Sequence, residues 1–127
     1  MVKAKAPSQR QLRVGEEIRH ILAEVLSRGL SGDEIIDSAS ITVSEVRISP
    51  DLMNATVYVL PLGGLHVPEI LKALKEKSWY FRKEVARKLT TRVTPRLVFQ
   101  ADLSFDEADR IEKLLKSPKV KKDVEGA

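Results

Sequence analysis

The chain has 127 residues, a net charge of +4 and no cysteine. This length predicts one domain with a sizeable core, and 43% hydrophobic beside 31% charged residues is typical of a folded globular protein. The lack of cysteine excludes disulfides, thiol chemistry and cysteine-ligated metals, and it fits a reducing compartment. The basic N-terminus has no apolar core behind it, and the longest uncharged stretch contains Pro and Gly. We therefore expect neither a secretory signal nor a membrane span.

The first folded segment is predicted to be a long amphipathic helix. Between residues 9 and 28, six apolar side chains recur at helical spacing within an arc of about 140°. They are Val14, Ile18, Ile21, Leu22, Val25 and Leu26. Gly29 follows, where a helix commonly ends on a residue in the left-handed region. The polar segment 30–40 is predicted to be a loop.

A β-hairpin is predicted to follow this loop. Residues 41–48 and 54–60 are rich in β-branched and aromatic side chains that alternate with polar ones. Between them, residues 49–51 read Ser-Pro-Asp, a composition that favours a turn. The alternation changes phase near Ser44 and Glu45, so we expect a β-bulge there, with both apolar pairs of the first strand facing the core.

The remaining segments predict a broken helix, a strand and a last helix. Residues 69–91 carry two apolar stripes that do not share one helical phase, so a kink is expected between them, at Lys77-Ser78-Trp79. Pro95 stops the helix, and the alternation over 97–101 predicts a third strand. Ser104 begins a capping box, which predicts a final helix.

This order of elements, α-β-β-α-α-β with a C-terminal helix, predicts a small α+β domain in which a three-stranded mixed sheet packs on helices. We expect residues 9–116 to form this domain, residues 1–8 to be a flexible basic arm and residues 117–127 a flexible charged tail. The order is also the layout of a type II KH domain, a fold that binds single-stranded RNA across a helix–helix junction. Such domains use a GxxG loop between these helices, and no GxxG stands at the predicted helix–helix junction of this sequence.

No residues stand in a catalytic or metal-binding pattern. His20 and His66 lie 46 residues apart, and neither has a metal-ligand neighbour at helical spacing. Asp102 and Asp106 flank the predicted cap, where carboxylates favour a helix N-terminus. The Gly63-Gly64 pair is not part of a phosphate-binding loop. We therefore expect no enzyme activity, no metal site and no cofactor.

The positive charge is concentrated in one part of the chain. Residues 1–30 carry a net +3, residues 31–61 a net −4, residues 62–96 a net +6 and residues 97–127 a net −1. Such asymmetry has two interpretations, a solvated helix face or a surface that binds a polyanion.

Within the basic segment, Tyr80, Lys83 and Arg87 share the helix face opposite the apolar stripe. An exposed aromatic ring between cations suits stacking on unpaired bases and contact with phosphates. Trp79 has two interpretations, a second stacking residue or part of the core. Arg82 likewise either contacts RNA or braces the fold. The residues predicted to bind RNA are Lys72, Lys75, Lys77, Tyr80, Lys83, Arg87, Lys88 and Arg92, together with Arg10 and Arg13.

Several short motifs, in this order and spacing, resemble one known family. The first helix contains Arg13-Val14-Gly15-Glu16-Glu17-Ile18-Arg19, and the hairpin contains Ile41-Thr42-Val43-Ser44-Glu45-Val46, Ser49-Pro50-Asp51-Leu52 and Ala55-Thr56-Val57-Tyr58-Val59. Arg82, Pro95-Arg96-Leu97-Val98-Phe99, Asp102 and Arg110-Ile111 complete the set. From about residue 12 to residue 115, the chain resembles the bacterial ribosome-binding factor A family.

The resemblance implies a KH-like domain that binds the small (30S) ribosomal subunit and its 16S ribosomal RNA during late maturation, and that supports processing of this RNA. It also implies a cytoplasmic, non-catalytic protein whose release involves an assembly GTPase. Members of this family usually carry an Ala-x-Gly element at the helix kink, and Lys77-Ser78-Trp79 occupies that position here. We expect the chain to be a monomer.

A second hypothesis is a non-catalytic protein-interaction module that holds a partner with the hairpin and the acidic segment 31–61, while the basic face is only solvated. In that case, charge reversal at Lys83 and Arg87 leaves binding intact. A DNA-binding helix-turn-helix is less favoured, because strands separate the first helix from the others.

Overall fold

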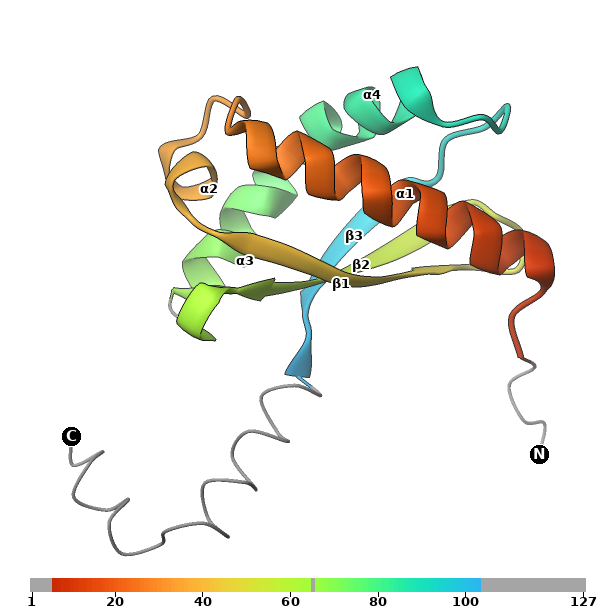
Figure 1. Ribbon diagram of the computed structural model, residues 1–127, viewed down its shortest axis with the longest axis horizontal. Helices are drawn as coiled ribbons and strands as arrows, with labels where there is room; N and C mark the ends of the chain where they lie inside the picture. The colour runs from red at the N-terminus through yellow and green to blue at the C-terminus, as the bar shows by residue number, and fades with distance from the viewer. Residues whose placement is uncertain (1–5, 65, 104–127) are drawn as a thin grey trace, which may run out of the picture.

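The computed structural model describes residues 6–64 and 66–103. Its elements are α1 (Gln9–Arg28), α2 (Glu34–Ser38), β1 (Ile41–Ile48), β2 (Asn54–Pro61), the 3-10 helix η1 (Leu62–Gly64), α3 (Val67–Glu76), α4 (Ser78–Lys88) and β3 (Arg96–Ala101), shown in Figure 1. The predicted final helix with its capping box at Ser104, and the charged tail, lie outside the described residues.

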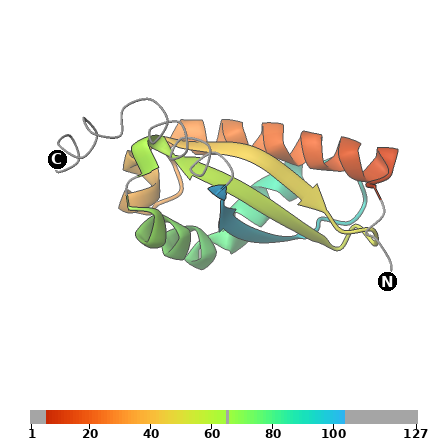
Figure 2. The same cartoon turned by 90° about the horizontal axis from the view of Figure 1, so that it is seen from below.

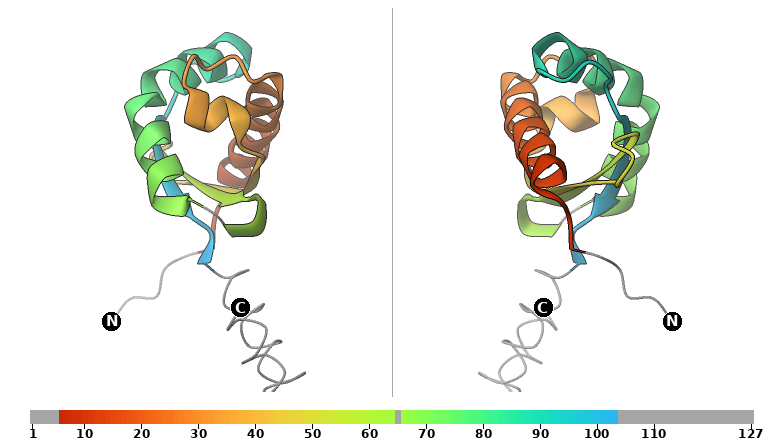
Figure 3. Two further views of the ribbon diagram at one scale, coloured as in Figure 1. Left: turned by 90° about the vertical axis from the view of Figure 1, so that its left-hand side faces the viewer. Right: turned by 90° about the vertical axis from the view of Figure 1, so that its right-hand side faces the viewer.

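The three strands form one mixed sheet in the order β1-β2-β3. Strand β2 pairs antiparallel with β1 and parallel with β3. A parallel pair needs a long crossover connection, which α3 and α4 supply. The helices lie on one face of the sheet, as Figures 1 and 3 show. The predicted α+β architecture, with its mixed sheet packed on helices, is confirmed.

Helix α1 packs closely on β1. Its predicted apolar stripe is buried except for Leu26, which is half-buried. The helix also comes near the sheet at Gly15, where an added Cβ would lie 2.6 Å from the carbonyl oxygen of Val46. At its C-terminus Gly29 adopts φ 62°, the left-handed cap expected from the sequence.

The hairpin forms as predicted, including its bulge. The pairing of β1 with β2 shifts between Val43 and Glu45. Because of this shift, Val43 and Ile48 both reach the core although their spacing in the sequence is odd. The turn is held by Asp51, whose carboxylate accepts hydrogen bonds from Ser49 Oγ at 2.6 Å and from the backbone N–H of Met53 at 2.9 Å.

The predicted kink lies between α3 and α4, at Lys77. This residue ends one helix and precedes the next, with φ −102° and ψ 15°. Its N–H donates to the Ala73 carbonyl at 3.0 Å, while its carbonyl accepts from the Tyr80 N–H at 2.9 Å. The two helices therefore meet at one residue that is hydrogen-bonded into both.

Two predictions about element boundaries were wrong. The predicted loop over 30–40 contains α2, a five-residue helix capped by Asp33, whose Oδ1 accepts from the N–H groups of Ile35 and Ile36 at 2.9 and 3.2 Å. The helix predicted to extend to residue 91 ends at Lys88. Beyond it, the N–H and hydroxyl of Thr90 both donate to the Glu17 carboxylate at 3.1 Å, which draws the chain toward α1.

Candidate nucleic-acid interface

A groove of about 490 Å³ lies between the α3–α4 junction and β3. Strand β3 is at the end of the sheet, beside these helices, as Figure 2 shows. The groove is lined by Lys75, Ser78, Trp79, Arg82, Arg96, Leu97, Val98 and Phe99. Its cations come from three different elements, one each from α3, α4 and β3. The fold therefore brings positively charged side chains from separate elements together on one concave surface.

The cations at this groove are not neutralised by neighbouring acids. Lys75 and Arg96 are exposed, and no carboxylate among the described residues lies within 4.0 Å of either. The same holds for Lys83, which shares an adjoining cavity of about 290 Å³ with Trp79 and Arg82. Unpaired cations in a groove create a positive potential that attracts phosphates.

Arg82 has a structural role at the same place. Its guanidinium donates to the carbonyls of Thr94 at 2.9 Å and Pro95 at 3.3 Å. These bonds tie α4 to the segment that leads into β3, and so they fix one wall of the groove. The interpretation that Arg82 braces the fold is confirmed, and its position in the groove also leaves it available to an anion.

The two aromatic residues of the kink lie in different environments, and the expectation for Tyr80 was wrong. Tyr80 was expected to be exposed, but it is half-buried and packed against the core, with its ring 5.1 Å from that of Phe81 in an edge contact. Trp79 is 61% exposed and is not part of the core. The Tyr80 ring packs against the core cluster beside Phe81, whereas the ring of Trp79, in the same first turn of α4, stays at the surface.

Lys77 extends from the kink toward the loop that precedes α2. Its ammonium lies 5.3 Å from the centre of the Trp79 ring, in a cation–π contact. It also lowers the pKa of Asp37. Burial alone would raise that pKa, but hydrogen bonds from Ser31 and Gly32, together with the charge of Lys77, hold it below its ordinary value. Lys77 is thus partly engaged within the fold.

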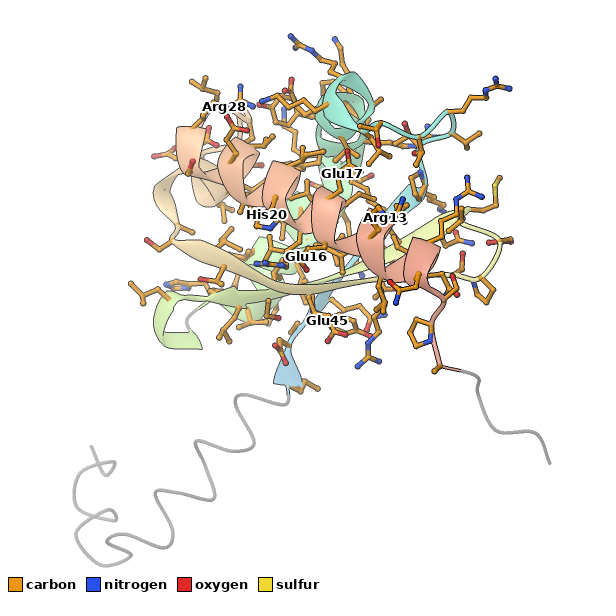
Figure 4. The ribbon with its side chains drawn as sticks, turned by 45° about the vertical axis from the view of Figure 1, so that its right-hand side comes forward. Arg13, Glu16, Glu17, His20, Arg28 and Glu45 are labelled. Atoms are coloured by element: carbon orange, nitrogen blue, oxygen red, sulfur yellow. The ribbon has the colours of Figure 1, made fainter. Side chains whose placement is uncertain are left out.

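Two predicted RNA-binding residues, Arg87 and Lys88, face acidic groups instead of an open groove. Lys88 Nζ lies 3.0 Å from Glu24 of α1, and a hydrogen bond and the charge of Lys88 lower the pKa of that carboxyl. Arg87 lies 3.5 Å from Glu84, a buried carboxylate that also pairs with Arg28 of α1 at 3.5 Å. Figure 4 labels Arg28 at the C-terminal end of α1.

The remaining predicted residues are spread around the molecule. Arg10 and Arg92 line a second cavity of about 320 Å³, between the start of α1, the hairpin turn and the α4–β3 connection. Arg13 is exposed on α1, where Figure 4 labels it, and Lys72 is exposed on α3. The structure therefore brings Lys75, Lys77 and Lys83 together around Trp79, and it places Arg10 and Arg92 together elsewhere.

Sequence reasoning did not assign Arg82, Arg96 or Trp79 to the binding set, although all three line the groove. For Arg96 a signal was present, because it directly precedes the alternating residues of the third predicted strand. Because β3 is an edge strand beside α3 and α4, its first residue, Arg96, lies near the junction of these two helices. The position of Trp79, by contrast, depends on how the two helices cross.

The acidic segment 31–61 is largely explained by local structure. Of its five carboxylates, four make hydrogen bonds within the fold, and they belong to Asp33, Asp37, Glu45 and Asp51. Glu45, for example, lies 2.8 Å from Arg47 on the same strand. This weakens the hypothesis that the segment is an acidic docking surface.

Other kinds of site are not found in the part of the chain that is described. No group of three or more His, Asp or Glu side chains within residues 6–64 and 66–103 is arranged to hold a metal ion. Over the same residues, no helix is long and apolar enough to cross a membrane.

The topology and the groove define the class of protein, a KH-like α+β domain of type II topology. A family model described as ribosome-binding factor A matches residues 10–115. The chain belongs to the ribosome-binding factor A family, as the sequence resemblance predicted.

Relatives of known name and structure agree with this assignment. The chain is 52% identical over 124 residues to ribosome-binding factor A of Paramagnetospirillum magneticum. This alignment covers 98% of this chain and 87% of the relative. The solution structure of a Thermotoga maritima putative ribosome-binding factor A has a TM-score of 0.62 at 28% identity, over 76% of this chain and 91% of that one. A Thermus thermophilus ribosome-binding factor A homology model, fitted into a map of a 30S complex, has a TM-score of 0.56 at 27% identity, over 70% of this chain and 91% of that one.

Proposed function

We propose that the chain is a non-catalytic assembly factor that binds the free 30S ribosomal subunit and contacts phosphates of its 16S ribosomal RNA through the groove between α3, α4 and β3. The observation that carries the proposal is a set of groove cations, Lys75 and Arg96 with Lys83 beside them, that have no carboxylate within 4.0 Å in the described part of the chain. RNA is the polyanion that a ribosome presents on its surface, and lysine and arginine are the residues that bind its phosphates.

The Thermus thermophilus relative, represented in a complex with the 30S subunit, supports the choice of this particle. We further propose that binding occurs late in maturation and supports processing of the ribosomal RNA, that an assembly GTPase assists release, and that the chain acts in the cytoplasm as a monomer. In this proposal residues 9–116 form the binding domain, and the arm 1–8 and the tail 117–127 flank it.

Cosedimentation with separated ribosomal particles tests the proposal. The chain is expected to comigrate with free small subunits and not with fully assembled ribosomes, since an assembly factor leaves the mature particle. If about five phosphates on unpaired RNA are neutralised, a threefold rise in salt weakens binding roughly 50-fold. Comigration with assembled ribosomes but not with free small subunits would contradict the proposal.

The protein-interaction hypothesis makes the opposite prediction for charge variants. Lys75→Gln with Lys83→Gln removes two cations beside the groove that have no carboxylate within 4.0 Å among residues 6–64 and 66–103. Arg19→Gln with Arg47→Gln removes two cations that are paired with Glu16 and Glu45. Both variants lose the same net charge. Weaker small-subunit binding in the first variant alone supports the RNA interface, and equal binding by both variants supports the protein-interaction module.

A further inference from the structure

We propose that Trp79 is a stacking platform for an unpaired nucleobase, so that the groove selects single-stranded over duplex RNA. This inference rests on the function proposed above and specifies the RNA that the groove takes. Trp79 is 61% exposed at the mouth of the groove, and it is the most exposed aromatic side chain among the described residues. Every base has a π-face, and an exposed indole offers the largest complementary ring of any side chain.

The surroundings of Trp79 fit a nucleotide better than an apolar partner. Its ring lines both the main groove and the adjoining cavity, so it stands between two concave surfaces. Lys75 and Arg96 lie in the first, and Lys83 lies in the second. A base stacked on the indole would therefore place the phosphates on either side of it near cations, which satisfies both the apolar and the anionic part of a nucleotide.

The ring is also held in place before any ligand arrives. Trp79 makes an edge contact with Tyr80 at 6.1 Å between ring centres, Tyr80 contacts Phe81 at 5.1 Å, and Phe81 contacts the buried Phe99 at 5.7 Å. This series of aromatic contacts connects the surface ring to the core. A ring that is already ordered loses less conformational entropy on binding, so more of the stacking free energy appears as affinity.

The cation–π contact of Lys77 with the indole leaves the ring accessible. The ammonium lies 5.3 Å from the ring centre, yet Trp79 keeps 61% of its surface exposed. An ammonium at this distance also raises the positive potential at the ring, where the phosphates of a stacked nucleotide would lie. Lys77 thus adds positive charge at the platform, while more than half of the Trp79 surface stays exposed.

The test uses the full chain, in which Trp79 is the single tryptophan and its fluorescence therefore reports on this site alone. The probes are a short single-stranded polyadenylate RNA and an RNA duplex of the same length. Polyadenylate is expected to quench Trp79 emission on binding, and the duplex is not. Binding of either probe is measured independently, by the anisotropy of a labelled strand.

Three variants separate stacking from other roles. Trp79→Leu is expected to weaken polyadenylate binding by roughly 5- to 150-fold and to leave duplex binding unchanged. Trp79→Phe keeps a ring and is expected to retain most of the affinity. Tyr58→Leu is the matched control, because it removes an aromatic ring from the sheet, where Arg47 lies 5.4 Å from its centre. This control is expected to bind as the unaltered chain does.

Several results would overturn the inference: no binding of polyadenylate, binding without quenching, or an equal loss of affinity for the single strand and the duplex in Trp79→Leu.

Binding to small subunits distinguishes a failure of this inference from a failure of the proposed function. If the unaltered chain and Trp79→Leu bind small subunits equally, the stacking role is wrong and the proposed function stands. If Trp79→Leu loses subunit binding but keeps polyadenylate binding, Trp79 contacts a ribosomal protein instead of a base. If the unaltered chain does not bind small subunits, the proposed function itself fails.

Discussion

Two basic regions of the molecule differ in what their cations contact. Along the boundary between α1 and α4, Arg28 and Arg87 share the buried Glu84, and Lys88 pairs with Glu24. At the groove between α3, α4 and β3, Lys75 and Arg96 have no carboxylate within 4.0 Å among the described residues. Arg28 apart, the sequence places both groups in one basic segment, residues 62–96. In the folded chain, the cations between α1 and α4 form ion pairs within the domain, whereas the cations at the groove remain available to an external anion.

This contrast shows why counting charges along a chain does not locate a binding surface. A cation that already has an acidic partner gains little from a phosphate, because the new contact replaces an existing one. An unpaired cation in a concave site gains more. Variants that alter the fold and variants that alter the groove are therefore expected to differ in what they change, stability or binding.

The largest effect is expected where α1 meets β1. In Gly15→Ala the new Cβ would lie 2.6 Å from the Val46 carbonyl oxygen, so helix and strand must move apart. We expect the free energy of unfolding to fall by about 1–3 kcal/mol. Urea denaturation measures it, and Ser27→Ala, an exposed position on the same helix, is expected to change it by less than about 0.5 kcal/mol. Equal stability of the two variants would contradict the close packing.

The next effect concerns Asp37, whose carboxylate accepts hydrogen bonds from Ser31 Oγ at 2.6 Å and Gly32 N–H at 3.1 Å. Asp37→Asn is expected to cost about 1–2 kcal/mol of unfolding free energy at neutral pH. Because the folded-state pKa lies below the ordinary 3.8, this contribution is present above pH 3.8 and is lost as pH falls through the lowered value. Urea denaturation of both chains at several pH values measures the difference, and a difference that grows on acidification would contradict this account.

Groove variants are expected to alter binding and to leave stability unchanged. Lys75→Gln with Arg96→Gln removes from the groove two cations that have no carboxylate partner in the described part of the chain. If each contacts one phosphate of unpaired RNA, affinity for small subunits falls about tenfold and the slope of log affinity against log salt decreases by about 1.4. Titration at several salt concentrations measures both quantities. Arg19→Gln with Arg47→Gln is the matched control, and the same loss in the control would mean that only net charge matters.

The smallest effect is expected for Lys88→Gln. Its partner Glu24 is exposed, and ion pairs of this kind contribute little to stability. Since this ammonium already has a partner, subunit affinity is expected to change less than in Lys75→Gln alone. Parallel titrations of the two single variants make the comparison. A larger loss from Lys88→Gln would place the RNA on the α1 side of α4.

Much of the fold could be predicted because its signals are local. The apolar stripe of α1 repeats over many turns, and the β-bulge follows from a change of phase between Val43 and Val46. Helix α2 could not be predicted from periodicity, because five residues do not complete two turns. Its stability comes from the side chain of Asp33, which caps it, and from the hydrogen bonds of Asp37 to the preceding loop.

The candidate site was only partly predictable, because its decisive contacts join distant segments. Lys88 pairs with a residue 64 positions earlier in the chain, and Thr90 binds one 73 positions earlier. A helical wheel contains neither contact. A helical wheel also treats every turn of a helix alike. It therefore predicted an exposed Tyr80, which is half-buried in the structure, and it left the environment of Trp79 undecided.

We propose that the groove between α3, α4 and β3 contacts RNA of the small subunit. Ultraviolet crosslinking of the full chain to isolated small subunits, with mapping of both the nucleotides and the protein residues, tests it most directly. The account predicts that the crosslinked residues lie between positions 72 and 96, with Trp79 among them, and that the nucleotides are unpaired. Crosslinks confined to the hairpin and the acidic segment 31–61 would contradict it.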